Sequence, residues 1–555
     1  MCRMSTLFLL VVCLSGCFGS GGGGGGGNNG APGTNADLSD LSLSAGPLDQ
    51  VFQANQVRYT ATVGFLAAST TVTPTTDDAN ATVTVNGVVV ISGTASGPIS
   101  LDEGPNNEIS VIVTAEDGMT KKVYTVSVTR QLADEFAQQA YLKAFDAAEN
   151  DEFGFSVALS GDTLAVGAVG KNSADNSKPD TGAVYVFTRN NGIWARQVEL
   201  KAFDAEENDQ FGSSVALSGD TLAVGAVGKN SVDNSKPDIG AVYVFTRDID
   251  GDWTRQAELK AFDAEENDEF GFSVALSGDT LAVGTIGKNS ADNSKPDIGA
   301  VYVFTRNNGI WTRQVELKAL DARENDQFGF SVALSGDTLA VGAVGKNSVD
   351  NSKPDIGAVY VFTRDIDGDW TRQDLLRASN ADIDDQFGFS VALSGDTLAV
   401  GSVYEDSSAS GGQDDNSALD AGAVYVFIRN NNGVWSQQSY LKASNANAGD
   451  LFGLVALSAD TLAVGAVGED SSASGGQDDN SALDAGAVYV FIRNNNGVWS
   501  QQSYLKASNA NADDQFGVVA LSGDTLAVGA VGEGSNAVGG EEDNSAPGAG
   551  AVYVF

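Results

Sequence analysis

Phe153-Gly-Phe-Ser-Val-Ala-Leu159 begins a unit that this chain repeats seven times. The same unit continues with Ser160-Gly-Asp-Thr-Leu-Ala-Val-Gly167, Gly182-Ala-Val-Tyr-Val-Phe187 and Trp194-Ala-Arg-Gln-Val-Glu-Leu200. Each run is short, rich in β-branched and aromatic residues, and bounded by Gly, Asp, Asn or Ser, which is typical of β-strands. Four such strands per unit, with units 58 to 65 residues apart, predict the four-stranded blades of a seven-bladed β-propeller in an all-β chain.

The repeats are offset from the ends of the chain, and this offset indicates a closed ring. The seventh copy ends at Phe555, before its fourth strand, whereas Phe136-Ala-Gln-Gln-Ala-Tyr-Leu142 matches the fourth-strand sequence Trp435-Ser-Gln-Gln-Ser-Tyr-Leu441. Because an unclosed ring exposes unpaired strand edges, we expect residues 136–143 to pair beside the strand that ends at Phe555. The alternative is an open solenoid, which would carry atypical capping repeats at its ends.

The pattern of apolar residues predicts the position of each strand in a blade. The first three runs are apolar on both faces, as in strands buried between neighbouring sheets, whereas the run from Trp194 to Leu200 alternates and should lie outermost. Copies six and seven are one residue shorter after Phe452-Gly and Phe516-Gly. We expect this change to remove a bulge at the Phe-Gly junction and to leave Leu457 and Leu521 facing as Leu159 does.

On the Phe-Gly and Gly-Ala pairs of each copy, residues 135–555 resemble the FG-GAP repeat. This family forms the propeller of integrin α subunits and of many bacterial surface proteins, so the resemblance implies an integrin-α-like propeller. Integrin-type repeats carry a calcium loop between strands one and two, where this chain has the short Ser160-Gly161-Asp162 turn. The resemblance therefore does not carry the family's metal sites over to this chain.

The first 36 residues have the composition of an export signal and a tether. Arg3, the apolar stretch from Leu7 to Leu14 and the small residues before Cys17 predict a signal peptide over residues 1–16. Leu14-Ser-Gly-Cys17 resembles the bacterial lipobox, which implies lipidation of Cys17, and Phe18 after it favours the outer membrane. The alternative is an ordinary signal peptide that is cleaved elsewhere. The Gly-rich residues 17–36 predict a flexible tether.

A separate domain is expected over residues 37–130. Short strands such as Tyr59–Val63, Ile109–Val113 and Val123–Val128, together with the hairpin signal Asn86-Gly87, predict a small β-sandwich. Leu41-Ser-Leu-Ser-Ala-Gly46 and Tyr124-Thr-Val-Ser-Val128 resemble the cadherin-like β-sandwich domain of bacterial surface proteins.

Composition excludes several classes of function. A formal net charge of −42 repels nucleic acid and anionic lipid, so neither is expected as a direct partner. The chain contains no histidine, and its three cysteines all lie within the first 17 residues, which excludes Ser-His and Cys-His catalysis and ordinary zinc sites in the folded part. We expect a monomer that is attached to the membrane through its lipid alone.

Acidic loops gather on one rim of the predicted propeller. The connections between strands two and three, and those that enter the next blade, carry carboxylates that could bind Ca²⁺, although none has the Asp-x-Asp-x-Asp-Gly spacing. Calcium is thus a possible cofactor, and no other is predicted. The candidate ligands are Asp175, Asp180, Asp204, Glu206, Asp209, Asp414 and Asp415. The alternative is that these loops are simply solvated.

Two further patterns bear on function. Asp162 recurs in all seven copies, which favours a structural role, and Asp248-Ile-Asp-Gly-Asp252 aligns with hairpin turns in other copies. Departures from the repeat are candidates for binding: Tyr404, Arg323 and Thr285. The sequence favours a non-catalytic surface protein that binds a protein or polysaccharide, or builds the envelope surface. The alternatives are a polysaccharide-active enzyme that uses carboxylates of the propeller, and a spacer without a ligand.

Overall fold

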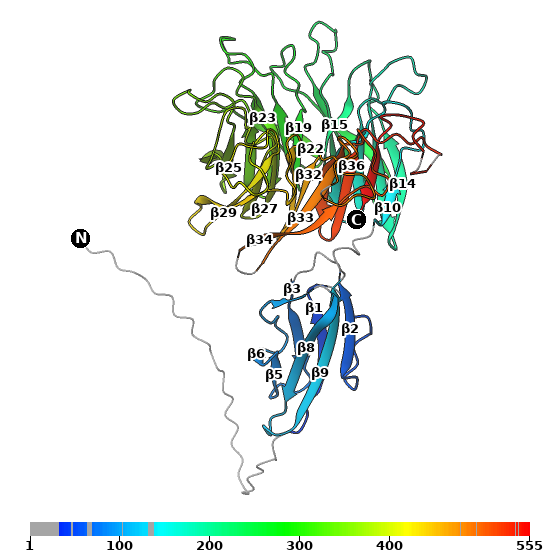
Figure 1. Cartoon of the computed structure of the whole chain (residues 1–555), viewed down its shortest axis with the longest axis vertical. Coiled ribbons are helices and arrows are strands. Elements are labelled where there is room, and N and C mark those ends of the chain that lie inside the picture. The colour runs from blue at the N-terminus through cyan, green and yellow to red at the C-terminus, as the bar shows by residue number, and fades with distance from the viewer. Residues whose placement is uncertain are drawn as a thin grey trace, which may run out of the picture. The chain divides into compact units, whose positions relative to one another are not determined.

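The computed structural model describes residues 33–45, 48–63, 69–102, 104–130, 138–477, 479–494, 497–538, 540–541 and 543–555. Within these residues every regular element is a β-strand, which confirms the predicted all-β class. No helix that could cross a membrane occurs in this part of the chain. The strands form two units, an N-terminal sandwich in blue and a propeller in cyan to red in Figure 1.

The sandwich contains a five-stranded sheet in the order β2-β9-β8-β5-β6 and two strand pairs, β1-β4 and β3-β7. Asn86 and Gly87 both adopt positive φ angles, 48° and 82°, and join β5 to β6 in the predicted hairpin. The strands are β1 (Leu38–Leu43), β2 (Arg58–Val63), β3 (Ser69–Thr70), β4 (Val72–Thr76), β5 (Thr82–Val85), β6 (Val88–Val90), β7 (Ile99–Ser100), β8 (Gly104–Thr114) and β9 (Lys121–Arg130).

The core of the sandwich forms because alternate residues of its strands face inward. Leu38, Val111 and Tyr124 are fully buried. The buried hydroxyl of Tyr124 accepts a hydrogen bond from the backbone N–H of Leu38 (3.0 Å) and donates one to the carbonyl of Ala54 (2.9 Å). Tyr124 thus ties β1 and the β1–β2 connection to β9 without leaving a buried polar group unpaired.

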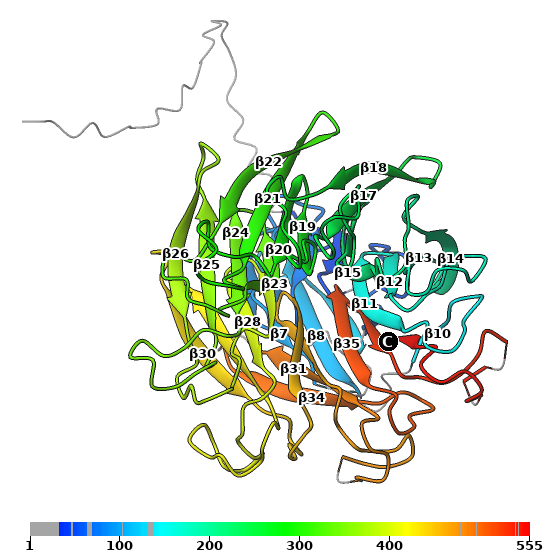
Figure 2. The same cartoon turned by 90° about the horizontal axis from the view of Figure 1, so that it is seen from above.

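The propeller consists of seven four-stranded antiparallel sheets, which Figure 2 shows arranged around a ring. Blades one to six each use four consecutive strands, as the repeat predicts. Their strands are β11 (Phe153–Ser160), β12 (Thr163–Ala168), β13 (Ala183–Asn190), β14 (Ile193–Leu200); β15 (Phe211–Ser218), β16 (Thr221–Ala226), β17 (Ala241–Arg247), β18 (Trp253–Leu259); β19 (Ser273–Ser277), β20 (Thr280–Thr285), β21 (Ala300–Asn307), β22 (Ile310–Leu317); β23 (Phe328–Ser335), β24 (Thr338–Ala343), β25 (Ala358–Arg364), β26 (Trp370–Leu376); β27 (Ser390–Ser394), β28 (Thr397–Ser402), β29 (Ala423–Arg429), β30 (Trp435–Leu441); and β31 (Phe452–Ser458), β32 (Thr461–Ala466), β33 (Ala487–Arg493), β34 (Trp499–Leu505).

Blade seven closes the ring with strands from both ends of the propeller. Its inner strands are β35 (Phe516–Ser522), β36 (Thr525–Ala530) and β37 (Ala551–Val554), and its outer strand is β10 (Ala140–Leu142). Ala140 pairs with Val554 and Leu142 with Val552, and the N–H of Gln139 donates to the carbonyl of Val554 at 2.7 Å. The predicted closure is confirmed for these residues, whereas Phe136 lies outside the described residues.

The core of the propeller lies between neighbouring blades. All six residues of β12 are buried, whereas in the outer strand β14 only Trp194 and Leu200 are. Val184 and Val186 of blade one pack in one cluster with Phe211 and Tyr243 of blade two. The two aromatic rings meet edge to face with centroids 5.4 Å apart. Strand order and burial therefore match the apolar pattern of the repeat.

The two most regular motifs of the repeat meet where blades join. Gly182 of blade one forms a parallel bridge with Phe211 of blade two, and equivalent bridges occur at the next junctions. Gly182 has a φ of +77°, and a Cβ atom there would lie 2.1 Å from the carbonyl oxygen of Phe211. Only glycine permits this approach, so the glycine of one blade and the phenylalanine of the next act as a single joint.

Candidate functional site

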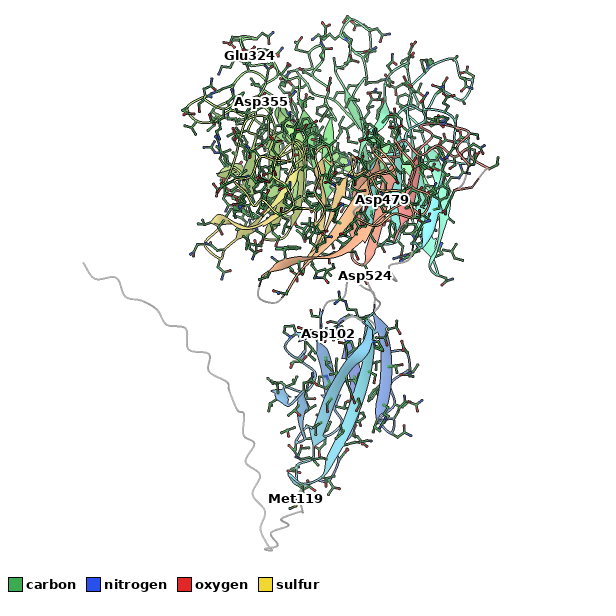
Figure 3. The ribbon with its side chains drawn as sticks, viewed as in Figure 1. Asp102, Met119, Glu324, Asp355, Asp479 and Asp524 are labelled. Atoms are coloured by element: carbon green, nitrogen blue, oxygen red, sulfur yellow. The ribbon has the colours of Figure 1, made fainter. Side chains whose placement is uncertain are left out.

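The loops of the propeller lie on two rims, as expected from the direction of the strands. Figure 3 shows Glu324 and Asp355 on loops at one end of the propeller and Asp524 at the other. Glu324 precedes β23, Asp355 lies between β24 and β25, and Asp524 lies in the turn between β35 and β36. We name the first end, which holds the blade entries and the connections between strands two and three, the acidic rim.

At the acidic rim the first strand of blade one begins with a bulge. Phe153 pairs with Ala168 and Ser156 with the adjacent Gly167, so Gly154 and Phe155 have no partner in the strand pairing. Gly154 has a φ of +101°, a conformation that residues other than glycine rarely adopt. The bulge frees Phe155 from the sheet, and its side chain is 43% exposed.

The bulge is shorter in blade six. Phe452 and Leu454 pair with adjacent residues of β32, so only one residue stays unpaired. The expectation that the one-residue deletion removes the bulge was wrong in this detail, because the bulge is shortened rather than lost. The deletion is absorbed at the Phe-Gly junction as expected, since Leu457 lies opposite Leu462 as Leu159 lies opposite Leu164.

The second bulge residue forms an aromatic arc around the acidic rim. It is Phe155, Phe272, Phe330 or Phe389 in four blades and Ser213 in blade two. The ring centroids of Phe272 and Phe330 are 5.1 Å apart, and those of Phe330 and Phe389 are 5.0 Å apart. Tyr404, which the sequence marked as a departure from the repeat, extends the arc with its ring 6.0 Å from that of Phe389. Blades six and seven lack this residue and blade two has Ser213, so the contacts between rings run through blades three to five.

The arc borders a cavity of about 660 Å³. Residues of blades one to five line the cavity. They include Ser213 of blade two, which interrupts the aromatic arc. An aromatic-lined cavity with a few polar groups is the usual form of a ligand site. The lining residues are Glu152, Phe155, Val169, Asn208, Gln210, Ser213, Val227, Gly228, Asp238, Glu269, Phe272, Phe330 and Phe389.

Three carboxylates of the cavity have a raised pKa. Burial is the main cause for Glu152, Asp238 and Glu269, and a neighbouring acidic group adds repulsion in each case. For Glu269 this repulsion comes from Asp238 and Asp297. Desolvation and repulsion both disfavour the charged carboxylate, so the cavity holds more negative charge than its surroundings balance.

The structure brings three of the predicted calcium ligands into one loop, where two of them contact the same lysine. Asp204 and Asp209 lie 3.2 Å and 2.9 Å from the ammonium nitrogen of Lys229. Glu206 donates its backbone N–H to Asp209 at 2.8 Å and pairs through its side chain with Lys178 at 2.9 Å. Ammonium groups therefore occupy the positions around which these carboxylates converge.

Within the described residues, the other predicted ligands form no ion pair with Lys229. Asp175 accepts hydrogen bonds from Ser173 and Ser177, and Asp415 from Ser408 and Ser417, which lower the pKa of each carboxyl to about 2. Asp180 has a positive φ of 50°, and Asp414 is exposed. Among the described residues no group of three or more acidic or cysteine side chains is placed to hold a metal ion. Calcium binding remains a prediction.

The sevenfold aspartate braces neighbouring blades. Arg247 donates to Asp220 at 2.6 Å within blade two and to Thr163 of blade one at 3.0 Å. The same aspartate, arginine and threonine contacts recur in blade one and in blades three to six. Asp248 accepts backbone N–H bonds from Asp250 and Asp252, so this acidic run forms a hairpin turn. These carboxylates stabilise the backbone, as the sequence favoured.

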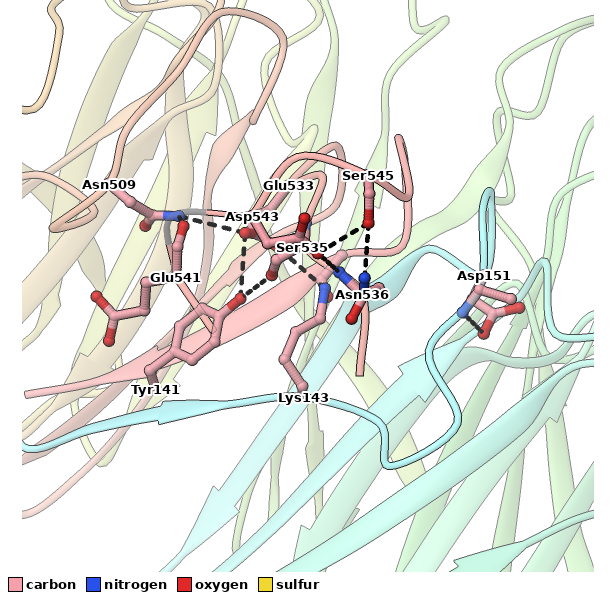
Figure 4. A network of polar contacts seen from close by, with 12 residues as sticks. Tyr141, Lys143, Asp151, Asn509, Glu533, Ser535, Asn536, Glu541, Asp543 and Ser545 are labelled. Atoms are coloured by element: carbon pink, nitrogen blue, oxygen red, sulfur yellow. Dashed lines mark hydrogen bonds and ion pairs between the residues drawn. The ribbon is translucent and has the colours of Figure 1, made fainter. Parts of the chain in front are cut away.

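Blades five to seven contain a buried polar network that the sequence analysis missed. In blade seven Glu533 is fully buried and lies 2.8 Å from Lys143. Tyr141 donates to Glu533 at 3.1 Å and contacts Ser535, while Asn509 donates to Glu533 at 3.2 Å (Figure 4). The signal was the replacement of lysine by glutamate after the second strand, which makes these three blades differ from the other four.

The two remaining departures from the repeat have local partners. Arg323 donates to the side chain of Asn351 at 2.6 Å, and Thr285 donates to the carbonyl of Asp268. Cys17, the predicted lipidation site, lies outside the described residues.

Comparison with known families agrees with this architecture. The FG-GAP repeat family matches residues 136–187, 194–245, 253–304, 311–362, 370–427, 435–491 and 499–555. The cadherin-like β-sandwich domain matches residues 38–131. A protein of Evansella cellulosilytica, named "Putative membrane protein", is 43% identical over 104 residues, which are 19% of this chain and 15% of that protein's length.

Proposed function

Since the chain belongs to the FG-GAP repeat family, we propose that it is a lipid-anchored bacterial surface protein that binds an extracellular ligand, without catalysis, in the aromatic cavity of its acidic rim. The observation that carries the proposal is the cavity itself, with its phenylalanine arc and three carboxylates. It includes a position at which the repeat varies, where Phe155 and its counterparts become Ser213 in blade two and are absent from blades six and seven. Such a departure from symmetry gives a repeat protein one distinct site.

The carboxylates of the cavity support binding rather than hydrolysis. A glycosidase needs one carboxyl group that stays protonated and one that stays ionised, in unlike environments. Burial and acidic neighbours raise the pKa of Glu152, Asp238 and Glu269 alike. The direction of the pKa shift therefore does not single out one of the three carboxyl groups as the acid and another as the base.

The lipid anchor rests on Leu14-Ser-Gly-Cys17 and on the apolar stretch before it. A Cys17→Ser variant should be released from membranes with its fold unchanged, since the acceptor of the lipid is lost. Membrane fractionation and processing in the presence of a lipoprotein signal peptidase inhibitor measure this. Retention of Cys17→Ser on membranes would contradict the anchor without affecting the cavity.

The binding role is tested with the mature protein on glycan and peptide arrays. Ser213→Phe introduces the residue that blades one, three, four and five carry at this position, and it should fill the cavity while preserving the fold. Asp524→Asn, exposed on the opposite rim, is the matched control. We expect Ser213→Phe to abolish array binding and Asp524→Asn to retain it. Equal binding by both variants, or the release of reducing sugars from a bound glycan, would overturn the proposal.

A further inference from the structure

Among the residues that the structure describes, none of those that line the cavity of the acidic rim is basic. Its charged members are Glu152, Asp238 and Glu269, and its apolar wall contains Phe272 and Phe330 among other residues. A phosphate, sulfate or carboxylate group would be repelled by these carboxylates, with no cation in the lining to offset the repulsion. The charge of the cavity therefore disfavours anionic ligands, including acidic sugars.

The three carboxylates lack a partner. Within the described part of the chain, no hydrogen bond or ion pair reaches the side-chain oxygens of Glu152, Asp238 or Glu269. The contrast with Asp209 is clear, because Asp209 is more deeply buried but lies 2.9 Å from Lys229. A cationic ligand would supply the positive charge that this cavity, unlike the blade interiors, does not provide for itself.

The aromatic arc adds a second requirement on the ligand. The phenylalanine rings of blades three to five form a continuous row, with centroids 5.1 Å and 5.0 Å apart, which Tyr404 extends. Aromatic faces attract cations and also pack against apolar C–H surfaces. A ligand that combines a cation with a rigid apolar face fits this wall better than a bare metal ion, which needs converging oxygen ligands.

The polar neutral groups favour a ligand with several hydroxyl groups. Asn208 and Gln210 line the cavity, and the hydroxyl oxygen of Ser213 is buried without a hydrogen-bond partner in the described residues. A lysine side chain from a peptide would present one polar group at the end of an apolar chain. A sugar ring presents hydroxyls around its edge and C–H groups on its faces.

We infer that the cavity binds an amine-bearing sugar unit of a glycan, with its ammonium group toward Glu269 and Asp238 and a face of its ring against the phenylalanine arc. This inference rests on the proposed binding function and specifies its ligand. The cavity of about 660 Å³ has room for a short oligosaccharide segment rather than a single side chain. Added salt should weaken the complex, because part of the attraction is between exposed charges.

The test compares three oligosaccharides of one length that differ at one carbon of each unit. Oligomers of glucosamine, N-acetylglucosamine and glucose carry an ammonium, an acetamido and a hydroxyl group there. Isothermal titration of the mature protein at pH 6 should give at least about tenfold tighter binding to the glucosamine oligomer than to the other two. Equal affinity for all three would overturn the inference and leave a binding function intact.

Two variants connect this preference to the cavity. Blades two and four have glutamine, Gln210 and Gln327, at the position of Glu269, so Glu269→Gln introduces a residue that the repeat already accepts there. The variant should lose most of the preference for the ammonium sugar. Phe330→Ala should weaken binding of all three sugars. Glu207→Gln, exposed on the same rim outside the cavity, is the control and should change affinity less than about twofold. An unchanged preference in Glu269→Gln would refute the placement.

A lysine-rich peptide of equal charge is the final comparison. If that peptide binds, if Ser213→Phe blocks it, and if no sugar competes, the ligand is a peptide and the sugar inference fails while the proposed function stands. If neither peptide nor sugar binds, and the arrays also yield no ligand that Ser213→Phe excludes, both proposals fail.

Discussion

Blades one to four and blades five to seven have the same four-stranded fold. At one buried position after the second strand, however, the first group has lysine and the second has glutamate. In blade two this position holds Lys229, which lies between Asp204 and Asp209. In blade six it holds Glu469, which lies 3.0 Å from Lys506 and accepts hydrogen bonds from Tyr504 and Ser471. At this position, therefore, one group of blades pairs a buried lysine with aspartates and the other pairs a buried glutamate with a lysine.

The surrounding residues change together with the central charge. Asp204 of blade two corresponds to Asn445 of blade six, and Glu258 corresponds to Tyr504. An acid next to the buried lysine is thus replaced by an amide next to the buried glutamate. The comparison shows that the repeat preserves pairing rather than residue identity, since an unpaired buried charge costs several kcal/mol.

The pKa directions of the two groups differ accordingly. Burial lowers the pKa of Lys229, but Asp209 and Asp204 outweigh burial and hold it above its ordinary value. Burial dominates for Lys506 and lowers its pKa despite Glu469. Burial likewise raises the pKa of Asp450 in blade six to about 7, with repulsion from Glu469 as a further cause. Burial also raises the pKa of the equivalent Asp209 in blade two, so the two groups differ in the direction for the lysine but not for this aspartate.

The largest effect is expected from breaking blade seven, where the glutamate network also closes the ring. A chain that begins at residue 144 lacks Lys143 and Tyr141 and leaves Glu533 buried without a cation, which costs about 3–5 kcal/mol, and it also exposes the edge of β37. Hydrogen exchange should show blade seven opening first. A chain that begins at residue 131 is the control; equal protection of β37 in both chains would contradict the role of this strand.

The next prediction compares the two central charges. Lys229→Met leaves Asp204 and Asp209 facing each other without a cation and should lower the free energy of unfolding by about 3–5 kcal/mol. Glu469→Gln leaves the buried Lys506 without its counter-charge, but it keeps a side-chain acceptor for Tyr504 and relieves the repulsion on Asp450, so its cost should be smaller, about 2–3 kcal/mol. Denaturant unfolding of both variants provides the comparison. A larger loss in Glu469→Gln would reverse our account of the two groups.

The third prediction concerns pH and distinguishes the same two groups. Burial raises the pKa of Asp385, Asp450 and Asp514 to about 7, whereas the unfolded value is 3.8. A raised folded pKa means that the folded state holds the extra proton, so this stability is present below the unfolded pKa and is lost as the pH rises through about 7. Between pH 4 and pH 7 these shifts correspond to a loss of about 4 kcal/mol for each of the three carboxyls.

Thermal melts from pH 5 to pH 8 measure this loss. A variant with asparagine at all three positions should lose the pH slope, because Asn keeps an acceptor oxygen but cannot be ionised. If the slope persists in that variant, the titrating groups lie elsewhere in the molecule.

The smallest effect is expected at the exposed brace between blades. Asp220 lies 2.6 Å from Arg247, and both side chains are partly accessible, so Asp220→Asn should cost about 0.5–1 kcal/mol. Asp524 occupies the same position in blade seven, and among the described residues no arginine forms an ion pair with it. Asp524→Asn should therefore leave the melting temperature unchanged, and a loss equal to that of Asp220→Asn would show that the turn, not the ion pair, needs the carboxylate.

Much of the fold follows from local pattern and from counting. Apolar runs such as Thr163-Leu-Ala-Val-Gly167 predict buried strands because period and composition are local properties, and the position of Phe136–Leu142 relative to Phe555 predicts closure because strands must pair. The predicted bulge change after Phe452 was correct in register and wrong in detail. Register follows from the apolar face, but the number of unpaired residues depends on how the neighbouring blade packs.

The candidate site depended on contacts between blades and could not be derived in the same way. Phe272, Phe330 and Phe389 are 58 or 59 residues apart, and only the curvature of the ring brings them side by side. The acidic loops were predicted correctly as one rim, but the tertiary structure decided which carboxylates meet Lys229 and which line an unpaired cavity. The number of charged residues can be read from the sequence. Which of these charges lie beside a charge of opposite sign depends on burial and distance in the folded chain.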